Sequence, residues 1–248
     1  MRGNMVRSKR AKAFVAGIVN SRLLSPLGGP ALHATQFVLG LNHREVVSFT
    51  QPTRSAEVAR IREIVTGFPS QTVGVDEAYM IRSAVLATER IPGVLAEVGV
   101  FRGGTARVIC EAKGDRTLHL FDTFEGLPSP TAIDRGFESG QYACSLDDVK
   151  KYLDGCRDVH FHQGLFPATA DPVRDLRFSF VHLDVDLYQS TLEALQFFYP
   201  RMSVGAMLIS HDYVEFAAVR RAFDDYLKDS SQPVLELSGN QCLIVKVA

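Results

Sequence analysis

The sequence predicts an α/β protein whose mainly parallel β-sheet carries helices on both faces. Apolar, β-prone segments alternate with segments of helical spacing from about residue 94 onward. A glycine-rich turn joins the first of these strands to a helix, and a two-residue turn joins the last two strands. Because parallel strands need long crossover connections, the intervening helices should cover the sheet, while the final strand should run antiparallel to its neighbour.

The composition is that of a globular protein without an obvious macromolecular partner. The chain has 248 residues, of which 46% are hydrophobic and 22% charged, and its formal net charge is −1. That balance gives no electrostatic reason to expect nucleic acid or acidic membranes. The four cysteines form no C-x-x-C pair, so they indicate neither a zinc site nor a disulfide framework. This cysteine usage suits a protein of the reducing cytoplasm. No apolar run reaches the ~18–20 residues that a membrane span needs.

Residues 1–75 are predicted to form an N-terminal helical extension, and residues 76–248 the main domain. The first ten residues are basic and the next nine are mostly small and apolar, an order that a signal peptide shares. Lys12 interrupts the apolar part and no clear cleavage site follows, so an amphipathic appendage is favoured. Apolar spacing then predicts helices over Ser55–Phe68 and Asp76–Arg90, which we expect to pack against the sheet and help cover a ligand.

The stretch around which the chain is organised is Val94–Cys110, with the sequence VLAEVGVFRGGTARVIC. It predicts a strand, a tight glycine turn and the start of a helix, an arrangement that presents backbone N–H groups to a ligand. The spacing E-x-G-x-x-x-G-G differs from the G-x-G-x-x-G of dinucleotide enzymes, which disfavours an NAD-dependent oxidoreductase. Glu97 would repel a pyrophosphate, so a nucleoside with an amino-acid tail fits better. An ordinary glycine-rich turn without a ligand is the alternative.

Strands and helices alternate after this turn. Strands are expected at residues 117–123, 159–164, 178–186 and 206–210, with helices at 146–153, 191–199 and 219–227. The final strands, 234–237 and 242–247, are joined through Gly239–Asn240, a good hairpin turn.

Acidic residues fall where successive strands end. Glu97, Asp122, Asp184 and Asp212 occupy such positions, and in doubly wound sheets ligands gather at this edge. Asp122 comes 23 residues after Gly99, close to the roughly 20-residue offset at which an acid accepts hydrogen bonds from ribose hydroxyls. The sequence therefore predicts a ligand site at the carboxyl ends of the strands.

A second group of residues is predicted to carry out chemistry. Asp184 and Asp186 are two apart, so on a strand both would project to one face, and a cation such as Mg²⁺ would relieve their repulsion. Asp212 is placed to join them. His211 suits other metals better than Mg²⁺ and has a suitable pKa to accept a hydroxyl proton. For Asp186, capping the next helix or binding a backbone turn is an equal alternative to a metal role. His182 is a weaker candidate on the face of Asp184.

These segments resemble the macrocin O-methyltransferase (TylF/MycF) family from about Asp76 to the C-terminus. The segments that carry the resemblance are AEVGVFRGGTA, LFDTFEGLPSP, VHLDVDLYQSTLEALQFFYPRM and GAMLISHDY. The family implies a seven-stranded, Rossmann-like methyltransferase sheet with a reversed final strand, and S-adenosylmethionine as methyl donor. It thereby implies that residues 76–248 form the catalytic domain.

The resemblance also implies roles for individual residues. The cofactor would be bound by Glu97, Gly99, Gly103, Gly104, Thr105, Asp122, Gln163, Gly164 and Asp184, with Asp122 on the ribose and Gln163–Gly164 beside the adenine. The family's metal motif usually continues as DDY, where this chain has His211–Asp212–Tyr213, so a histidine replaces one usual carboxylate. Asp184, His211 and Asp212 are the metal ligands implied for Mg²⁺ or another divalent ion. Without a metal, Asp184 or His211 is predicted to act as the base.

The predicted function is S-adenosylmethionine-dependent O-methylation of a hydroxyl on a small natural product, which in this family is often a sugar hydroxyl. Segment Ser129–Ser145 is expected to be a mobile lid over the acceptor. The expected partners are the small acceptor and, by family resemblance, a second copy of the chain, with no nucleic acid. The competing hypothesis is a catalytically silent protein of the same fold that binds the cofactor and serves as a partner or scaffold.

Overall fold

The computed structural model describes residues 52–67, 73–237 and 239–247, all within one compact unit that spans residues 51–248. The predicted amphipathic leader lies outside the described residues, so the boundary proposed at residue 75 stays a prediction. Among the residues described, no helix combines the length and the apolarity that a bilayer crossing requires.

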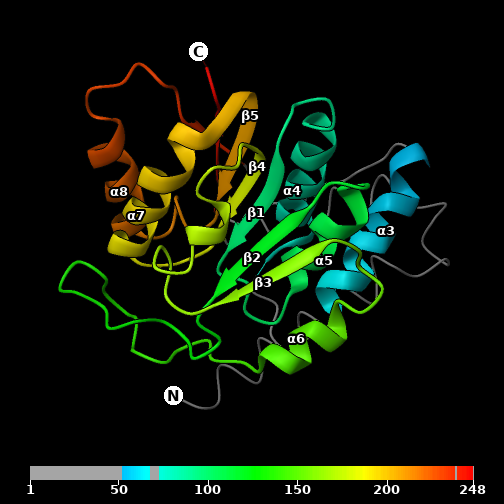
Figure 1. Cartoon of the computed structure of the whole chain (residues 1–248), viewed down its shortest axis with the longest axis horizontal. Helices are drawn as coiled ribbons and strands as arrows, with labels where there is room; N and C mark the ends of the chain where they lie inside the picture. Colours follow the sequence, from blue (N-terminus) through cyan, green and yellow to red (C-terminus); the bar gives the residue numbers. More distant parts are fainter. Residues whose placement is uncertain (1–51, 68–72, 238, 248) are drawn as a thin grey trace, which may run out of the picture. The chain divides into compact units, whose positions relative to one another are not determined.

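The sheet has seven strands in the order β3-β2-β1-β4-β5-β7-β6 (Figure 1). They are β1 (Val94–Val98), β2 (Leu118–Asp122), β3 (Val159–Gln163), β4 (Phe178–Leu183), β5 (Met202–Ser210), β6 (Leu235–Glu236) and β7 (Cys242–Val245). Strands β1 to β5 pair in parallel, and β7 is antiparallel to both β5 and β6. The predicted doubly wound sheet with a reversed final strand is therefore confirmed. Its order changes direction between β1 and β4, the place where such sheets bind ligands.

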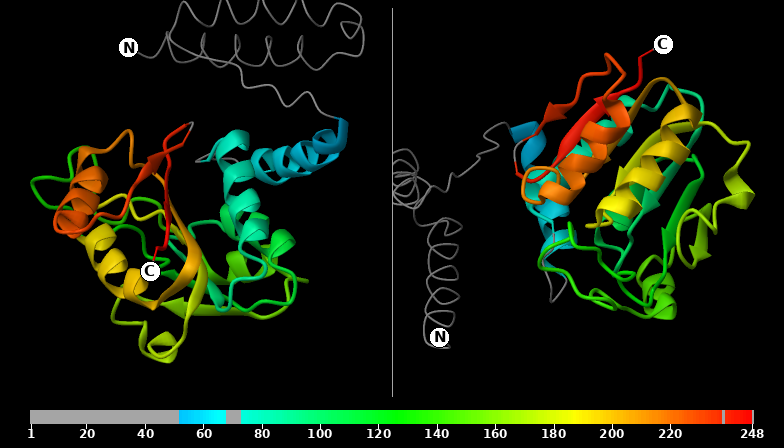
Figure 2. Two further views of the ribbon diagram at one scale, coloured as in Figure 1. Left: turned by 90° about the horizontal axis from the view of Figure 1, so that it is seen from above. Right: turned by 90° about the vertical axis from the view of Figure 1, so that its left-hand side faces the viewer.

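Helices cover both faces of this sheet, as Figures 1 and 2 show. They are α3 (Pro52–Thr66), α4 (Val75–Ala87), α5 (Gly104–Ala112), α6 (Leu146–Tyr152), α7 (Tyr188–Phe198) and α8 (Ala217–Leu227). Short 3₁₀ turns occupy Asp171–Val173 and Tyr199–Arg201. Helices α7 and α8 lie on one face, and α3, α4 and α5 on the other. The first two predicted helices correspond to α3 and α4.

Two apolar cores lie on opposite faces of the sheet. Leu120 packs in the core with α3, α4 and α5, whereas its neighbour Phe121 packs in the core with α7 and α8. Phe180 and Val181 on β4 alternate in the same way, and all four side chains are fully buried. Because successive strand residues face opposite sides, a strand covered on both sides must be apolar at every position. The continuous apolar run from Phe178 is the sequence signature of this arrangement.

The end of β4 differs from the prediction, and the difference positions the site. β4 stops at Leu183, whereas the sequence predicts a strand through Asp186. Asp186 has φ = 59°, a left-handed conformation that cannot continue a strand. The prediction that Asp184 and Asp186 project together from a strand is therefore wrong. α7 consequently begins at Tyr188, three residues before the predicted Thr191.

Candidate active site

A cavity of about 500 Å³ opens at the carboxyl ends of the parallel strands, within the range typical of small-molecule sites. Its acidic wall residues are Glu77, Asp122, Asp184, Asp186, Asp212 and Glu215, with His211 among them. Apolar side chains such as Phe101, Leu127, Leu165 and Phe166 complete the wall. Among the described residues that line the cavity, none is a lysine or an arginine. The cavity therefore suits a neutral or cationic molecule better than a phosphorylated one.

Gly99 brings the end of β1 against the end of β4. It has φ = +84°, and a Cβ atom there would lie 1.8 Å from the backbone oxygen of Asp184. Any larger residue would therefore push the two strand ends apart. Gly103 has φ = +83° and forms the N-cap of α5, so the helix starts directly after the turn. Close packing therefore explains Gly99, and a left-handed backbone conformation explains Gly103.

Asp122 holds the loops on both sides of it. Its Oδ2 accepts the backbone N–H of Val100 at 2.7 Å and of Phe101 at 2.8 Å, and its Oδ1 accepts that of Phe124 at 2.7 Å. Asp122 also lines the cavity, where the ribose prediction requires it. Its organising role for the β1 turn was not part of that prediction.

Glu97 lies beneath the cavity and does not line it. Its side chain is fully buried, its Oε1 is 2.9 Å from Nδ1 of His182, and it accepts a hydrogen bond from the Thr105 hydroxyl. Burial raises the pKa of Glu97, although the neighbouring His182 opposes that effect. His182 is thus turned toward Glu97 and away from the cavity. The geometry favours an indirect role for Glu97, and its predicted contact with the cofactor stays a prediction.

The remaining predicted cofactor residues divide into two groups. Gly99, Asp122, Gly164 and Asp184 lie on the cavity wall, whereas Gly103, Gly104, Thr105 and Gln163 do not. Gln163 is exposed at the end of β3, where it pairs with Asp122 across the strands. Its neighbours Gly164, Leu165 and Phe166 form the wall in its place.

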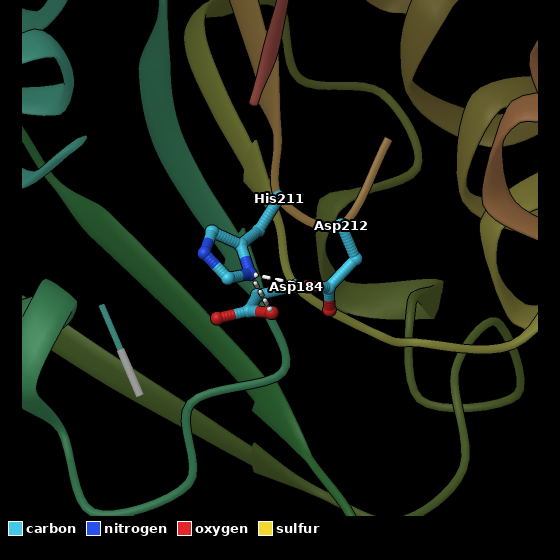
Figure 3. A group of neighbouring side chains, drawn as sticks. All are labelled: Asp184, His211 and Asp212. Carbon is cyan, nitrogen blue, oxygen red and sulfur yellow. Dashed lines mark ion pairs between the residues drawn. The ribbon is translucent and has the colours of Figure 1, made fainter. Parts of the chain in front are cut away.

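Asp184, His211 and Asp212 converge in one cluster, as predicted (Figure 3). Nδ1 of His211 lies 2.9 Å from Oδ1 of Asp212 and 3.4 Å from Oδ1 of Asp184. One donor atom from each of the three residues lies within 4.8 Å of the others. The cluster forms because β4 and β5 are parallel neighbours that end side by side. A set of two carboxylates and one imidazole can bind a divalent cation or accept a proton.

Asp186 lines the same cavity but does not cap the next helix. The N-cap of α7 is Leu187, and the backbone N–H of Tyr188 donates instead to Oδ1 of Asp134 at 2.7 Å. The helix-capping alternative for Asp186 is therefore wrong. Burial, reinforced by the charges of Asp184 and Asp212, raises the pKa of Asp186 to about 9.

Two residues that the sequence reasoning missed complete the cluster. Oε2 of Glu77, on α4, lies 3.5 Å from Nε2 of His211. Glu77 is itself held by the backbone N–H groups of Gly74 at 2.7 Å and Asn240 at 2.8 Å. Asn240 also donates from Nδ2 to Oδ1 of Asp212 at 2.7 Å. In the sequence, Glu77 is an acid in the first turn of a helix and Asn240 is part of a hairpin turn. These two patterns predicted only local roles for the residues.

The carboxylates set the ionisation of the cluster. Burial opposes a charge on His211, but Asp184, Asp212 and Glu77 together raise the pKa of His211 well above its ordinary value. Burial also opposes ionisation of Glu77, yet its hydrogen bonds to His211 and to the Gly74 backbone lower its pKa. The pKa of Asp184 is likewise lowered, because the attraction of His211 outweighs burial. In the metal-free protein the imidazole is therefore a cation among anionic carboxylates.

Comparison with known proteins identifies the family. Residues 73–236 match the family model described as macrocin-O-methyltransferase (TylF). The chain belongs to the TylF family. It is therefore an O-methyltransferase of the class that depends on S-adenosylmethionine, as the resemblance predicted.

Individual relatives support this assignment. The chain is 35% identical over 184 residues to the 8-demethyl-8-(2,3-dimethoxy-α-L-rhamnosyl)-tetracenomycin-C 4′-O-methyltransferase of Streptomyces olivaceus, covering 66% of this chain and 70% of that protein. It is 30% identical over 205 residues to the demethyldecarbamoylnovobiocin O-methyltransferase of Streptomyces niveus, covering 74% and 78%. The solved structure of the O-methyltransferase NovP superposes with a TM-score of 0.67 at 23% identity, covering 78% of this chain and 99% of that one. The last likeness confirms the fold.

In this TylF-family member the segment between β2 and α6 runs as a long loop (Figure 1). It contributes Leu127 and Tyr142 to the wall. Among the contacts that anchor it are the bond from Tyr188 to Asp134 and one from Sγ of Cys144 to the backbone oxygen of Phe101 at 2.9 Å. The role of Ser129–Ser145 as a mobile lid over the acceptor stays a prediction.

Proposed function

We propose that this chain transfers the methyl group of S-adenosylmethionine to a sugar hydroxyl of a small, glycosylated natural product. The observation that carries the proposal is that Asp122 and the Asp184–His211–Asp212 cluster line one cavity. The first is suited to the ribose of the donor and the second to a hydroxyl that must lose its proton. The relatives from Streptomyces olivaceus and Streptomyces niveus bear the names of enzymes that methylate elaborate natural products, the first of them rhamnosylated.

The donor side of the cavity fits a sulfonium nucleoside. The carboxylate of Asp122 can accept a hydrogen bond from a ribose hydroxyl, since Oδ2 binds two backbone N–H groups but Oδ1 binds only one and retains acceptor capacity. Leu165 and Phe166 offer an apolar wall for a purine ring next to Gly164. When bound, S-adenosylmethionine supplies a methyl group already activated by positively charged sulfur.

On the acceptor side, Asp184 is the proposed proton acceptor. Its Oδ1 faces His211, which leaves Oδ2 available to a hydroxyl in the cavity. In the transfer the carbon–sulfur bond breaks, a carbon–oxygen bond forms, and the hydroxyl proton passes to Asp184. His211 holds Asp184 in place from behind, and Asn240 holds Asp212. Alignment of the acceptor oxygen with the methyl group supplies most of the remaining acceleration.

The donor set of the cluster also fits a divalent metal ion. Asp184, His211 and Asp212 would hold it, and it would lower the pKa of the acceptor hydroxyl and orient that group. The same charges favour a neutral acceptor, because the described lining residues include six carboxylic acids and neither lysine nor arginine. A glycoside satisfies this requirement better than a sugar that carries a diphosphate.

The experiment is a methyl-transfer assay with labelled S-adenosylmethionine and a panel of rhamnosylated polyketides and aminocoumarins, with products examined by mass spectrometry. We expect a gain of one methyl group on the sugar of at least one compound. Asp184→Asn should lower kcat at least ~100-fold, the usual loss on removing a general base. Asp224→Asn, on the exposed surface of α8, is the matched control and should be unchanged. Methylation of the aglycone alone, or full activity of Asp184→Asn, would refute the proposal.

A further inference from the structure

We propose that the Asp184–His211–Asp212 cluster is a metal site selective for a first-row transition ion over Mg²⁺, with Glu77 as the residue that orients its histidine ligand. The inference rests on the proposed function only in that the cluster faces the acceptor. Metal binding is measured without an acceptor, so the two proposals can fail separately.

The first argument is the spacing of the donor atoms. Two atoms that each lie about 2.1 Å from one ion are about 3.0 Å apart at a right angle and about 3.4 Å apart at the tetrahedral angle. Nδ1 of His211 lies 2.9 Å from Oδ1 of Asp212 and 3.4 Å from Oδ1 of Asp184. The separations from His211 therefore already match those around a first-row ion, before any side chain moves.

The second argument is the orientation of the imidazole. Nδ1 points toward the two aspartates, and Nε2 points away from them (Figure 3), toward Oε2 of Glu77 at 3.5 Å. Among the described residues no group makes a hydrogen bond to this buried nitrogen in the metal-free structure, and Glu77 is its ion-pair partner. Histidines that bind metals nearly always donate their other ring N–H to a carboxylate or carbonyl, which fixes the tautomer that leaves a lone pair for the ion. Glu77 occupies that position.

The Glu77 carboxylate is held in this position by backbone hydrogen bonds. It accepts backbone N–H groups from Gly74 and from Asn240, and the residue is 8% exposed. Asn240 in turn donates to Oδ1 of Asp212, so one asparagine fixes both the outer carboxylate and a ligand. The carboxylate that faces the imidazole is thus tied to both α4 and the final hairpin.

The third argument is the chemistry of the donors. Mg²⁺ prefers oxygen ligands only, whereas imidazole nitrogen favours Fe²⁺, Co²⁺, Ni²⁺ and Zn²⁺. An imidazole nitrogen binds these first-row ions more strongly than it binds Mg²⁺, so His211 favours them over Mg²⁺. A histidine at this position therefore changes which ion is bound.

The test uses the full, tag-free chain, stripped with a chelator and titrated with Co²⁺ or Mg²⁺ by calorimetry. We expect one Co²⁺ site at least ~100-fold tighter than Mg²⁺. The ¹H NMR spectrum of the Co²⁺ form should show one strongly shifted, solvent-exchangeable resonance from the Nε2 proton of His211. His211→Asp should abolish that resonance. It should also reduce the ratio of the Mg²⁺ Kd to the Co²⁺ Kd at least ~10-fold.

Glu77→Gln separates positioning from folding. It should weaken Co²⁺ binding ~10- to 100-fold and speed exchange of the shifted proton, in a variant whose metal-free form still unfolds cooperatively and still binds S-adenosylhomocysteine. Asp76→Asn, in the same helical turn, should leave Co²⁺ binding unaltered.

The proposal is overturned if Mg²⁺ binds as tightly as Co²⁺, or if bound Co²⁺ gives no shifted exchangeable proton. It is also overturned if no divalent ion binds while S-adenosylhomocysteine still does. The His211 imidazole would then pair with the two aspartates in place of a metal ion. These readings on the native chain hold even if a variant fails to fold.

Discussion

Nδ2 of Asn240 donates a 2.7 Å hydrogen bond to Oδ1 of Asp212, joining the last turn of the chain to the acidic cluster that ends β5. Asp212 has φ = 63°, so this contact holds a residue in a conformation that it rarely adopts alone. The final hairpin therefore helps to shape the active site in addition to completing the sheet.

Removal of that bond should reduce catalysis. Asn240→Ala is expected to lower kcat/KM about 10-fold, because a hydrogen bond to a charged group contributes roughly 1.5–3 kcal/mol and part of this is recovered by water. Steady-state kinetics with saturating S-adenosylmethionine measures the change. Gln189→Ala, an exposed side chain that pairs with Glu193 on α7, should leave kcat/KM unchanged. An Asn240→Ala enzyme with parental kinetics would show that Asp212 does not depend on the hairpin.

Gly99→Ala should prevent normal folding. The new Cβ would meet the Asp184 backbone oxygen at 1.8 Å, so β1 and β4 would have to separate. Gly155 has nearly the same backbone angle, φ = +83°, but open space around its Cβ position. Gly155→Ala should therefore cost only about 1–2 kcal/mol of conformational strain, whereas Gly99→Ala should cost several times more or yield no soluble protein. Urea unfolding compares the two, and equal losses would mean that the close approach is unimportant.

Glu97→Gln should distinguish a structural role from direct cofactor contact. Glu97 is fully buried against His182 and Thr105, and removing one member of such a buried polar group typically destabilises by about 3 kcal/mol or more. We expect a clear fall in the free energy of unfolding, with the Kd for S-adenosylhomocysteine changed less than ~3-fold. For comparison, loss of a direct contact worth ~1 kcal/mol would change this Kd by a factor of about 5. A large loss of binding in a stable protein would instead support the contact that the sequence pattern predicts.

Acid should destabilise the protein through His119. Burial, with contributions from His162 and His160, lowers the pKa of His119 from 6.5 to about 4. The unfolded chain therefore binds more protons between these values, so stability is complete above pH 6.5 and is lost as the pH falls toward 4. The pKa difference of about 2.5, at about 1.4 kcal/mol for each pKa unit, gives at most about 3.5 kcal/mol. Chemical unfolding at several pH values measures it, and His119→Phe should flatten the slope. An unaltered slope would contradict this assignment.

Parts of the site followed from the sequence because they depend on strand ends. Asp122, Asp184, His211 and Asp212 each come at or just after an apolar run, and parallel strands place such residues at one edge. Glu97 was harder to place, because a single residue of register decides whether a side chain enters the cavity or the layer beneath it. The strand prediction failed at Asp186 for a related reason. Asp186 itself adopts a left-handed conformation, and the segment contains no glycine that would have indicated one.

The sequence by itself determined the elements, their alternation, the reversed last strand and the edge at which the acids gather, because periodicity and turn residues act over a few neighbouring positions. Only the tertiary structure decided that Glu77 of α4 faces His211 and that Asn240 of the final hairpin links Glu77 to Asp212. This arrangement depends on how α4 packs on the sheet and how β7 pairs with β5. Such contacts join residues far apart in the chain, and no local pattern records them.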